Sequence, residues 1–221
     1  MRAFIAVPGG FACDLEPAEL RIIARVVADT AELLGSSIDG EPDAVGHVPP
    51  SAPDGDGPGP DDAAPVPPSA TDAAVLAALA WDPAGGETPR DPALARLLPP
   101  ASTDDDELAA EMRRLTEGAV RATKVDQLRV VHRTLTQSSG VVIVRKGQER
   151  SWLAALTDLR LVLASRLGIE TDDDAERVYE RAGSSHPQTP AEELDAALTS
   201  LYAALTWWQE SLLEAMSGGQ P

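Results

Sequence analysis

The chain is short of cysteine, aromatic residues and long apolar runs, and each shortage excludes a class of protein. Its only cysteine is Cys13, so no intramolecular disulfide can form. Small secreted domains usually depend on paired cysteines, and a single one favours a reducing compartment. Aromatic residues make up 4% of the chain, so a core must be built mainly from Leu, Val, Ile and Ala. No window approaches the ~18 apolar residues of a membrane span.

The amino terminus also lacks the pattern of an export signal. Its apolar run is short and is interrupted at Pro8, Gly9 and Gly10, whereas a signal peptide needs a longer apolar stretch. We therefore expect a cytoplasmic protein without a membrane partner. A length of 221 residues favours one domain, or one and a half.

Positive charge is scarce and unevenly placed. The chain has 18 Lys and Arg against 36 Asp and Glu, a net charge of -18. Residues 113–166 nevertheless hold eleven basic and four acidic side chains. An acidic protein is repelled by nucleic acid unless its charge is segregated. Here it is segregated, so the composition leaves DNA binding open.

Residue composition divides the chain into three parts. Residues 1–34 alternate apolar groups around Pro8-Gly9-Gly10, which predicts a β-hairpin, and then show helical spacing from Pro17 onward. Residues 35–70 are rich in Pro, Gly, Asp and Ser and contain seven acids, which predicts a disordered acidic spacer. Residues 71–218 carry repeated helix signals. We expect residues 1–34 and 71–218 to share one core, as a single folded domain.

The helical body is predicted from caps and apolar spacing. Short helices are expected at 72–80, 91–98 and 171–182, and longer ones at 103–138 and 148–167. Thr189-Pro190-Ala191-Glu192 is a capping box that opens a last helix with heptad apolar spacing. This spacing requires a partner helix, either in the same chain or in a homodimer through helix 190–216. The β-branched run 141–145 predicts a strand that joins the hairpin. The fold class is therefore mainly α, a helical bundle with a small β-sheet.

No catalytic or metal-binding pattern is present. The three histidines, His47, His132 and His186, are far apart and lie near no cysteine or paired carboxylates. The acidic runs 104–107 and 172–174 lack the spacing and central glycine of a calcium loop. No glycine-rich nucleotide-binding motif occurs. We therefore predict no catalytic, cofactor-binding or metal-binding residue, and no enzyme.

The basic segment supplies candidate contact residues. Its side chains could contact DNA phosphates or dock on an acidic protein surface. The alternative is local pairing with Asp and Glu, and it is favoured because no DNA- or RNA-reading motif accompanies the segment. The candidates are Arg113, Arg114, Arg121, Lys124, Arg129 and Arg133.

Cys13 is a candidate redox thiol. A sensor cysteine needs a low pKa, and the neighbouring Asp14 and Glu16 would raise the pKa of this thiol. Its alternation with Phe11 and Leu15 predicts a small buried side chain in a strand instead.

Several segments occur in the order typical of one family. They are Leu15–Leu20, Asp91–Pro99, Glu111–Glu117, Trp152–Leu161, Arg166–Ile169 and Leu205–Leu212. On these segments the chain resembles the actinobacterial domain-of-unknown-function family two-thousand-seventeen. The resemblance implies a protein encoded near the ClpS protease adaptor and cysteine-metabolism genes, linked to oxidative-stress transcription through an alternative sigma factor. It also implies a redox switch made of a cysteine pair, which a chain with one cysteine cannot form.

The motif residues in these segments are expected to be mainly structural. Thr157 and Ala164 stand where the resemblance leads us to expect Asn and Gly. Asp158 lies in an apolar helix face, so we predict a buried or half-buried Arg partner for it. The motif residues are Trp152, Asp158, Arg160, Arg166, Trp208 and Gln209.

These features predict a non-enzymatic cytosolic protein that acts by binding protein or DNA. The resemblance implies that its role is regulatory, transcription-associated and stress-related. A sigma factor is one candidate partner. The alternative is an adaptor or homodimeric structural protein linked to proteolysis, with no DNA binding. The two interpretations differ in salt dependence, because DNA binding weakens steeply as the salt concentration rises.

Overall fold

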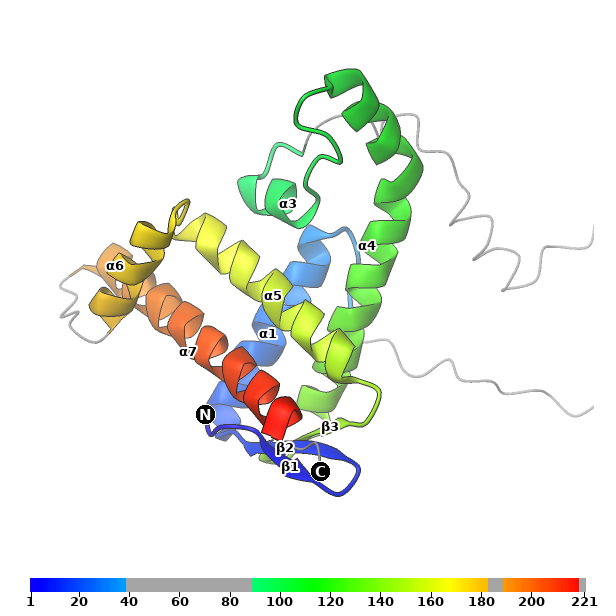
Figure 1. The fold of residues 1–221 in the computed structure, drawn as a ribbon. Helices are drawn as coiled ribbons and strands as arrows, with labels where there is room; N and C mark the ends of the chain where they lie inside the picture. The colour runs from blue at the N-terminus through cyan, green and yellow to red at the C-terminus, as the bar shows by residue number, and fades with distance from the viewer. Residues whose placement is uncertain (39–88, 183–188, 219–221) are drawn as a thin grey trace, which may run out of the picture.

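Helices form most of the described chain, and a small sheet lies at one end (Figure 1). The computed structural model describes residues 1–38, 89–182 and 189–218. The mainly α fold with a small sheet is confirmed. Most of the predicted spacer, 39–70, and the predicted helix at 72–80 lie outside the described residues. The strands are β1 (Ile5–Val7), β2 (Gly10–Asp14) and β3 (Val141–Arg145), and the helices are α1 (Pro17–Leu33), α3 (Pro92–Leu97), α4 (Asp106–Thr136), α5 (Glu149–Arg166), α6 (Asp172–Ala182) and α7 (Pro190–Gly218).

The sheet has the order β1-β2-β3, and both strand pairs are antiparallel. The first two strands form the predicted hairpin, which turns at Pro8 and Gly9, where Gly9 has a φ of 88°. Gly10 lies opposite Arg145, and a Cβ atom at this position would come within 2.0 Å of the Val144 carbonyl oxygen. Glycine at this position therefore lets β3 approach β2 and complete the predicted sheet.

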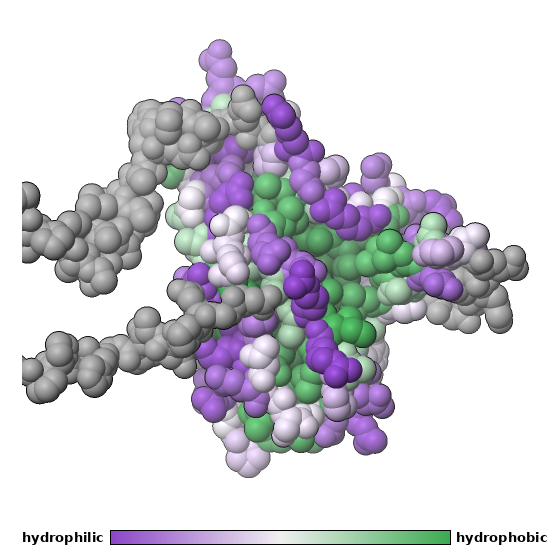
Figure 2. Space-filling model, turned by 180° about the vertical axis from the view of Figure 1, so that it is seen from behind, coloured by the Kyte–Doolittle hydropathy of each residue, from purple (hydrophilic) through white to green (hydrophobic). Residues whose placement is uncertain are grey.

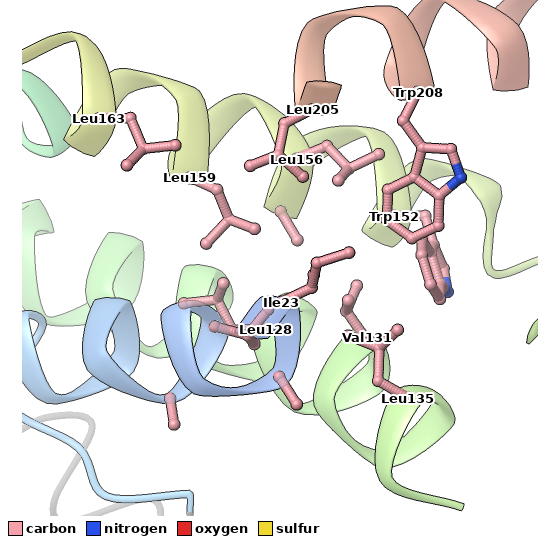
Figure 3. Close-up of a cluster of buried hydrophobic side chains, with 14 of the residues drawn as sticks. Ile23, Leu128, Val131, Leu135, Trp152, Leu156, Leu159, Leu163, Leu205 and Trp208 are labelled. Atoms are coloured by element: carbon pink, nitrogen blue, oxygen red, sulfur yellow. The ribbon is translucent and has the colours of Figure 1, made fainter. Parts of the chain in front are cut away.

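The core lies between α1, α4, α5 and α7 (Figure 3). Ile23 of α1 and Leu128 of α4 are at most 1% exposed. Trp208 stacks on Phe4 with ring centroids 5.1 Å apart and meets Trp152 edge-on at 5.6 Å. This aromatic cluster joins the hairpin to α5 and α7. Residues before 39 and after 88 therefore contribute to one continuous core.

The second half of the heptad pattern of α7 is buried within the chain. Leu205, Trp208 and Leu212 are fully buried, and α7 packs against α5 and α6. Its neighbour α5 runs antiparallel to it (Figure 1). A homodimer through helix 190–216 would therefore have to use other faces of this helix or its first turns, where Leu194 is 61% exposed.

Side-chain caps are present at the starts of several helices. At the start of α3, the Asp91 carboxylate accepts a hydrogen bond from the backbone N–H of Ala93 at 2.8 Å. At the start of α7, the Thr189 hydroxyl accepts from the Glu192 N–H at 3.2 Å, and the Glu192 carboxylate accepts from the Thr189 N–H at 3.1 Å. The predicted capping box is therefore present.

The first folded segment continues beyond its predicted end at residue 34. The Ser36 N–H donates to the Ala31 carbonyl at 2.9 Å, and Ile38 is 7% exposed. The predicted boundary at residue 34 is too early because the apolar side chain of Ile38, although it lies in a polar, glycine-containing stretch, still reaches the core.

Candidate functional site

The six candidate basic residues all lie on α4, and several pair with acids on the same helix. Arg114 pairs with Glu111, and Arg129 pairs with Asp126 at 2.8 Å. Each pair spans one helical turn, the spacing at which side chains meet on a helix surface. This is the local pairing that the sequence favoured. It neutralises much of the positive charge that would otherwise attract DNA phosphates.

Glu117 holds two more of the candidate arginines. Its Oε1 accepts hydrogen bonds from Nε and Nη2 of Arg121 at 2.8 and 2.7 Å. Its Oε2 lies 3.6 Å from Nε of Arg113. Arg121 also donates to the Leu34 carbonyl at 3.2 Å, which ties α4 to the end of α1. Arg113 is 8% exposed, so its side chain faces the interior.

Lys124 forms an ion pair with the buried Asp158 of α5. The Nζ–Oδ1 distance is 2.6 Å, and Asp158 is 2% exposed. Burial raises the pKa of Asp158, while the ammonium group of Lys124 acts in the opposite direction. The buried acid was predicted, but its predicted arginine partner is wrong. The cation is a lysine, because α4 packs beside α5 and places Lys124 next to Asp158.

Arg160 instead links α5 to α7. Its Nε donates to the Thr206 hydroxyl at 2.9 Å, and its Nη1 donates to Oε1 of Gln209 at 3.0 Å. The guanidinium lies over the Tyr202 ring, 5.7 Å from its centroid. Nε2 of Gln209 donates to the Thr157 hydroxyl at 2.9 Å. The threonine that stands in place of the expected asparagine therefore still joins the two helices.

The remaining motif residues also make contacts between elements. Arg166, at the end of α5, donates to Oδ2 of Asp91 at 2.8 Å, and so ties α5 to the cap of α3. Hydrogen bonding from Arg166 holds the pKa of Asp91 below its usual value. Trp152 and Trp208 are fully buried. The motif thus gathers contacts that hold α3, α4, α5 and α7 together.

Cys13 is 3% exposed, as its strand position predicted. Burial raises the pKa of its thiol to about 12. The thiolate is the form that reacts with oxidants, and at neutral pH this environment keeps the thiol protonated. Its surroundings are therefore the opposite of those that activate a redox-sensing cysteine.

One side of α4 carries apolar residues that face solvent. We call Leu108, Met112, Leu115, Ala119 and Ala122 the outer face of α4. Leu108, Met112 and Leu115 are 51%, 38% and 63% exposed. The first half of α4 extends beyond the other helices, with α3 beside it (Figure 1). The predicted spacing marks a helix correctly, but this stripe is not part of the core.

Other apolar surface is also present. Viewed from behind, hydrophobic residues gather near the middle of the molecule between hydrophilic ones (Figure 2). On the outer side of the sheet, Ile5 and Ile143 flank Ala12 in register and are 63% and 48% exposed. Three short strands span only a few hundred Å², below the roughly 800 Å² per partner of a stable interface. The longer outer face of α4 is the stronger candidate.

The contacts described above involve the segments that the sequence singled out. A family model matches residues 1–216. The chain belongs to the family of the domain of unknown function DUF2017. No curated protein and no solved structure matches it. In this DUF2017 chain, Asp158, Arg160 and Arg166 of the segments that carry the resemblance each join one helix to another element.

Two other kinds of site were sought in the described part of the chain. Within residues 1–38, 89–182 and 189–218, no three His, Cys, Asp or Glu side chains are grouped to hold a metal ion. None of the helices described for this chain is long and apolar enough to cross a membrane.

Sequence reasoning missed the division of α4 into two faces. The spacing of Arg113, Glu117 and Lys124 places them on one side of the helix, opposite Leu108 and Leu115. A helical projection would have shown both stripes. It would not have shown which of them faces the protein.

Proposed function

We propose that this chain is a non-enzymatic regulatory protein that acts by binding another protein through the outer face of α4. The observation that carries the proposal is the exposure of Leu108 and Leu115, at 51% and 63%, on a helix face with heptad spacing. Apolar residues at this spacing form the contact line between paired helices. Contiguous exposed apolar residues mark interaction sites on soluble proteins.

Charge along α4 favours an amphipathic helix of a partner protein as the occupant. The outer face is preceded by the acidic run 104–107 and continues after residue 122 into Asp126, Arg129 and Arg133. A partner helix with basic residues near the acidic run would match this end of the outer face. Such complementarity fixes the direction and register of a helix pair.

The family resemblance supports the regulatory part of the proposal and its transcription-associated, stress-related role. The single cysteine supports a cytoplasmic location. Local pairing of Arg114, Arg121, Lys124 and Arg129 favours protein over DNA as the ligand. A sigma factor that presents such an amphipathic helix would suit the outer face. An adaptor linked to proteolysis would use the same face, and the identity of the partner distinguishes the two.

The test compares two leucines of nearly equal exposure. Leu115→Lys changes the outer face, and Leu194→Lys changes a residue of α7 that is 61% exposed. A photo-crosslinking residue at each position identifies the partner in cells, and binding is then measured with the purified partner. We expect Leu115→Lys to weaken binding at least ~10-fold, since interface anchors contribute more than about 1 kcal/mol. Leu194→Lys should leave binding unchanged.

Three outcomes would contradict the proposal. The first is equal binding by both variants. The second is a crosslink from position 115 only to a second copy of this chain, with a dimer seen by light scattering. The third is promoter-DNA binding that weakens steeply with salt and is unaffected by Leu115→Lys, which would favour the DNA interpretation.

A further inference from the structure

The side of α4 opposite its outer face borders a pocket of about 380 Å³. This volume lies within the range of small-molecule sites, about 300–1,000 Å³. One wall comes from α3 and the residues after it, and the other comes from α4. The apolar lining includes Leu97, Leu98, Pro99 and Val120, and the charged lining includes Arg113 and Glu117.

Arg113 is the unusual group in this pocket. Its side chain is 7% exposed, and its one ion pair within the described residues is the 3.6 Å contact between its Nε and Oε2 of Glu117. Among the described residues, no group accepts a hydrogen bond from its guanidinium. A guanidinium carries five N–H donors, and buried charges are normally both paired and hydrogen-bonded. The donors of Arg113 are therefore available to a ligand.

Among the described residues, the charges around the pocket leave one cation in excess. Glu117 is shared between Arg113 and Arg121, and its Oε1 is already taken by the Arg121 fork. Lys124, which also lines the pocket, is balanced by Asp158. Three cationic side chains thus face two carboxylates. A single negative charge from outside would balance the group.

We infer that this pocket binds a small monocarboxylate with an apolar body. The carboxylate would accept a forked pair of hydrogen bonds from Arg113, the geometry that a guanidinium fits best. The apolar body would lie against Leu97, Leu98 and Val120. A phosphate dianion would bring two charges to a site that lacks one, and a neutral molecule would leave Arg113 unpaired. The inference is independent of the proposed partner site, which lies on the opposite side of α4.

The test is an NMR titration of the full-length, ¹⁵N-labelled chain with octanoate. Octanol, octylammonium and inorganic phosphate are the comparison probes, because each lacks either the negative charge or the apolar body. We expect octanoate to give saturable shifts at one site, in the amides of residues 97–101 and 113–124. The comparison probes should give none there.

Variants separate the charge from the shape of the pocket. Arg113→Met should weaken octanoate binding at least ~10-fold, since a buried charge-assisted pair is lost. Val120→Phe keeps the charge, fills the pocket and should weaken binding as well. Arg114→Met removes the neighbouring arginine, which pairs with Glu111 outside the pocket, and should bind normally. Far-UV circular dichroism checks that each variant is folded.

The inference is overturned if octanoate gives no saturable shifts, or if octanol binds as tightly as octanoate. It is also overturned if a folded Arg113→Met binds like the parent chain. Should Arg113→Met fail to fold, Val120→Phe provides the test. Unchanged octanoate affinity in Val120→Phe would show that octanoate does not bind in this pocket.

Discussion

Asp158 is an acid held among leucines in the middle of α5. One oxygen meets Lys124, while the other, Oδ2, has no hydrogen-bond partner among the described residues. A buried carboxylate that is only partly satisfied loses more from desolvation than it regains from its partner. The direction of its pKa shift, upward, agrees with this balance. At this single residue, burial outweighs pairing.

Asp158→Asn tests that balance through the pH dependence of stability. Because the folded-state pKa lies above the usual 3.8, the stabilising contribution of Asp158 is complete below pH 3.8 and is lost as pH rises through the folded-state pKa. Asn does not titrate. The free energy of unfolding of the parent chain, minus that of Asp158→Asn, should therefore fall as pH rises above about 4. Urea unfolding at several pH values measures the difference.

A matched control is Asp126→Asn. Asp126 is also an aspartate with a cationic partner, but its side chain is 70% exposed. Its substitution should give a difference of less than about 1 kcal/mol, as for other exposed pairs. A difference for Asp158→Asn that rises with pH would show instead that pairing with Lys124 dominates burial.

At the scale of the element, α4 shows how one helix serves two environments. Its second half is buried on one side through Leu128, Val131 and Leu135. Its first half contacts solvent on the outer face and borders the pocket on the other. The helix remains continuous from Asp106 to Thr136 despite Gly118. The first half of the helix has few neighbouring elements, so the backbone hydrogen bonds of the helix itself hold it straight there.

Gly118→Ala should stabilise the protein. A Cβ atom added at Gly118 meets no atom within 4 Å, so the substitution costs no space. Alanine within a helix is more favourable than glycine by about 0.5–1 kcal/mol, and we expect the free energy of unfolding in urea to rise by that amount. Gly10→Ala is the contrasting variant, since its Cβ would clash with the Val144 carbonyl. A loss of stability in Gly118→Ala would mean that α4 is not a continuous helix at this position.

For the whole molecule, the aromatic cluster connects parts that are distant in sequence. Phe4 comes from the residue before β1, Trp152 from α5 and Trp208 from α7, and both tryptophans are fully buried. With aromatic residues at only 4% of the chain, a large share of them is concentrated at this one junction. The junction joins the sheet end of the molecule to the helical bundle.

Trp208→Ala should destabilise the whole fold by about 3–5 kcal/mol, the usual cost of emptying a buried aromatic site. The adjacent Trp207 is 45% exposed, and Trp207→Ala should cost no more than about 0.5 kcal/mol. Thermal and urea unfolding, followed by far-UV circular dichroism, measures both. Equal effects from the two variants would show that Trp208 does not hold the core together.

Local structure could be predicted because its causes are local. The hairpin at Pro8–Gly9, the Asp91 cap and the capping box at Thr189 each depend on residues within one turn of one another. The burial of Cys13, Trp152 and Trp208 followed from strand alternation and helical spacing. The extent of the first segment was underestimated, since composition alone did not reveal that Ile38 reaches the core.

The sequence by itself determined which segments are helices or strands, where most of them begin and end, and which family the motif segments resemble. Only the tertiary structure decided that Lys124, rather than an arginine, balances Asp158, and that Arg113 faces a pocket. It also decided that the apolar stripe of Leu108 and Leu115 faces solvent. The physical reason is that periodicity identifies the two sides of a helix, whereas the packing of other elements decides which side is covered.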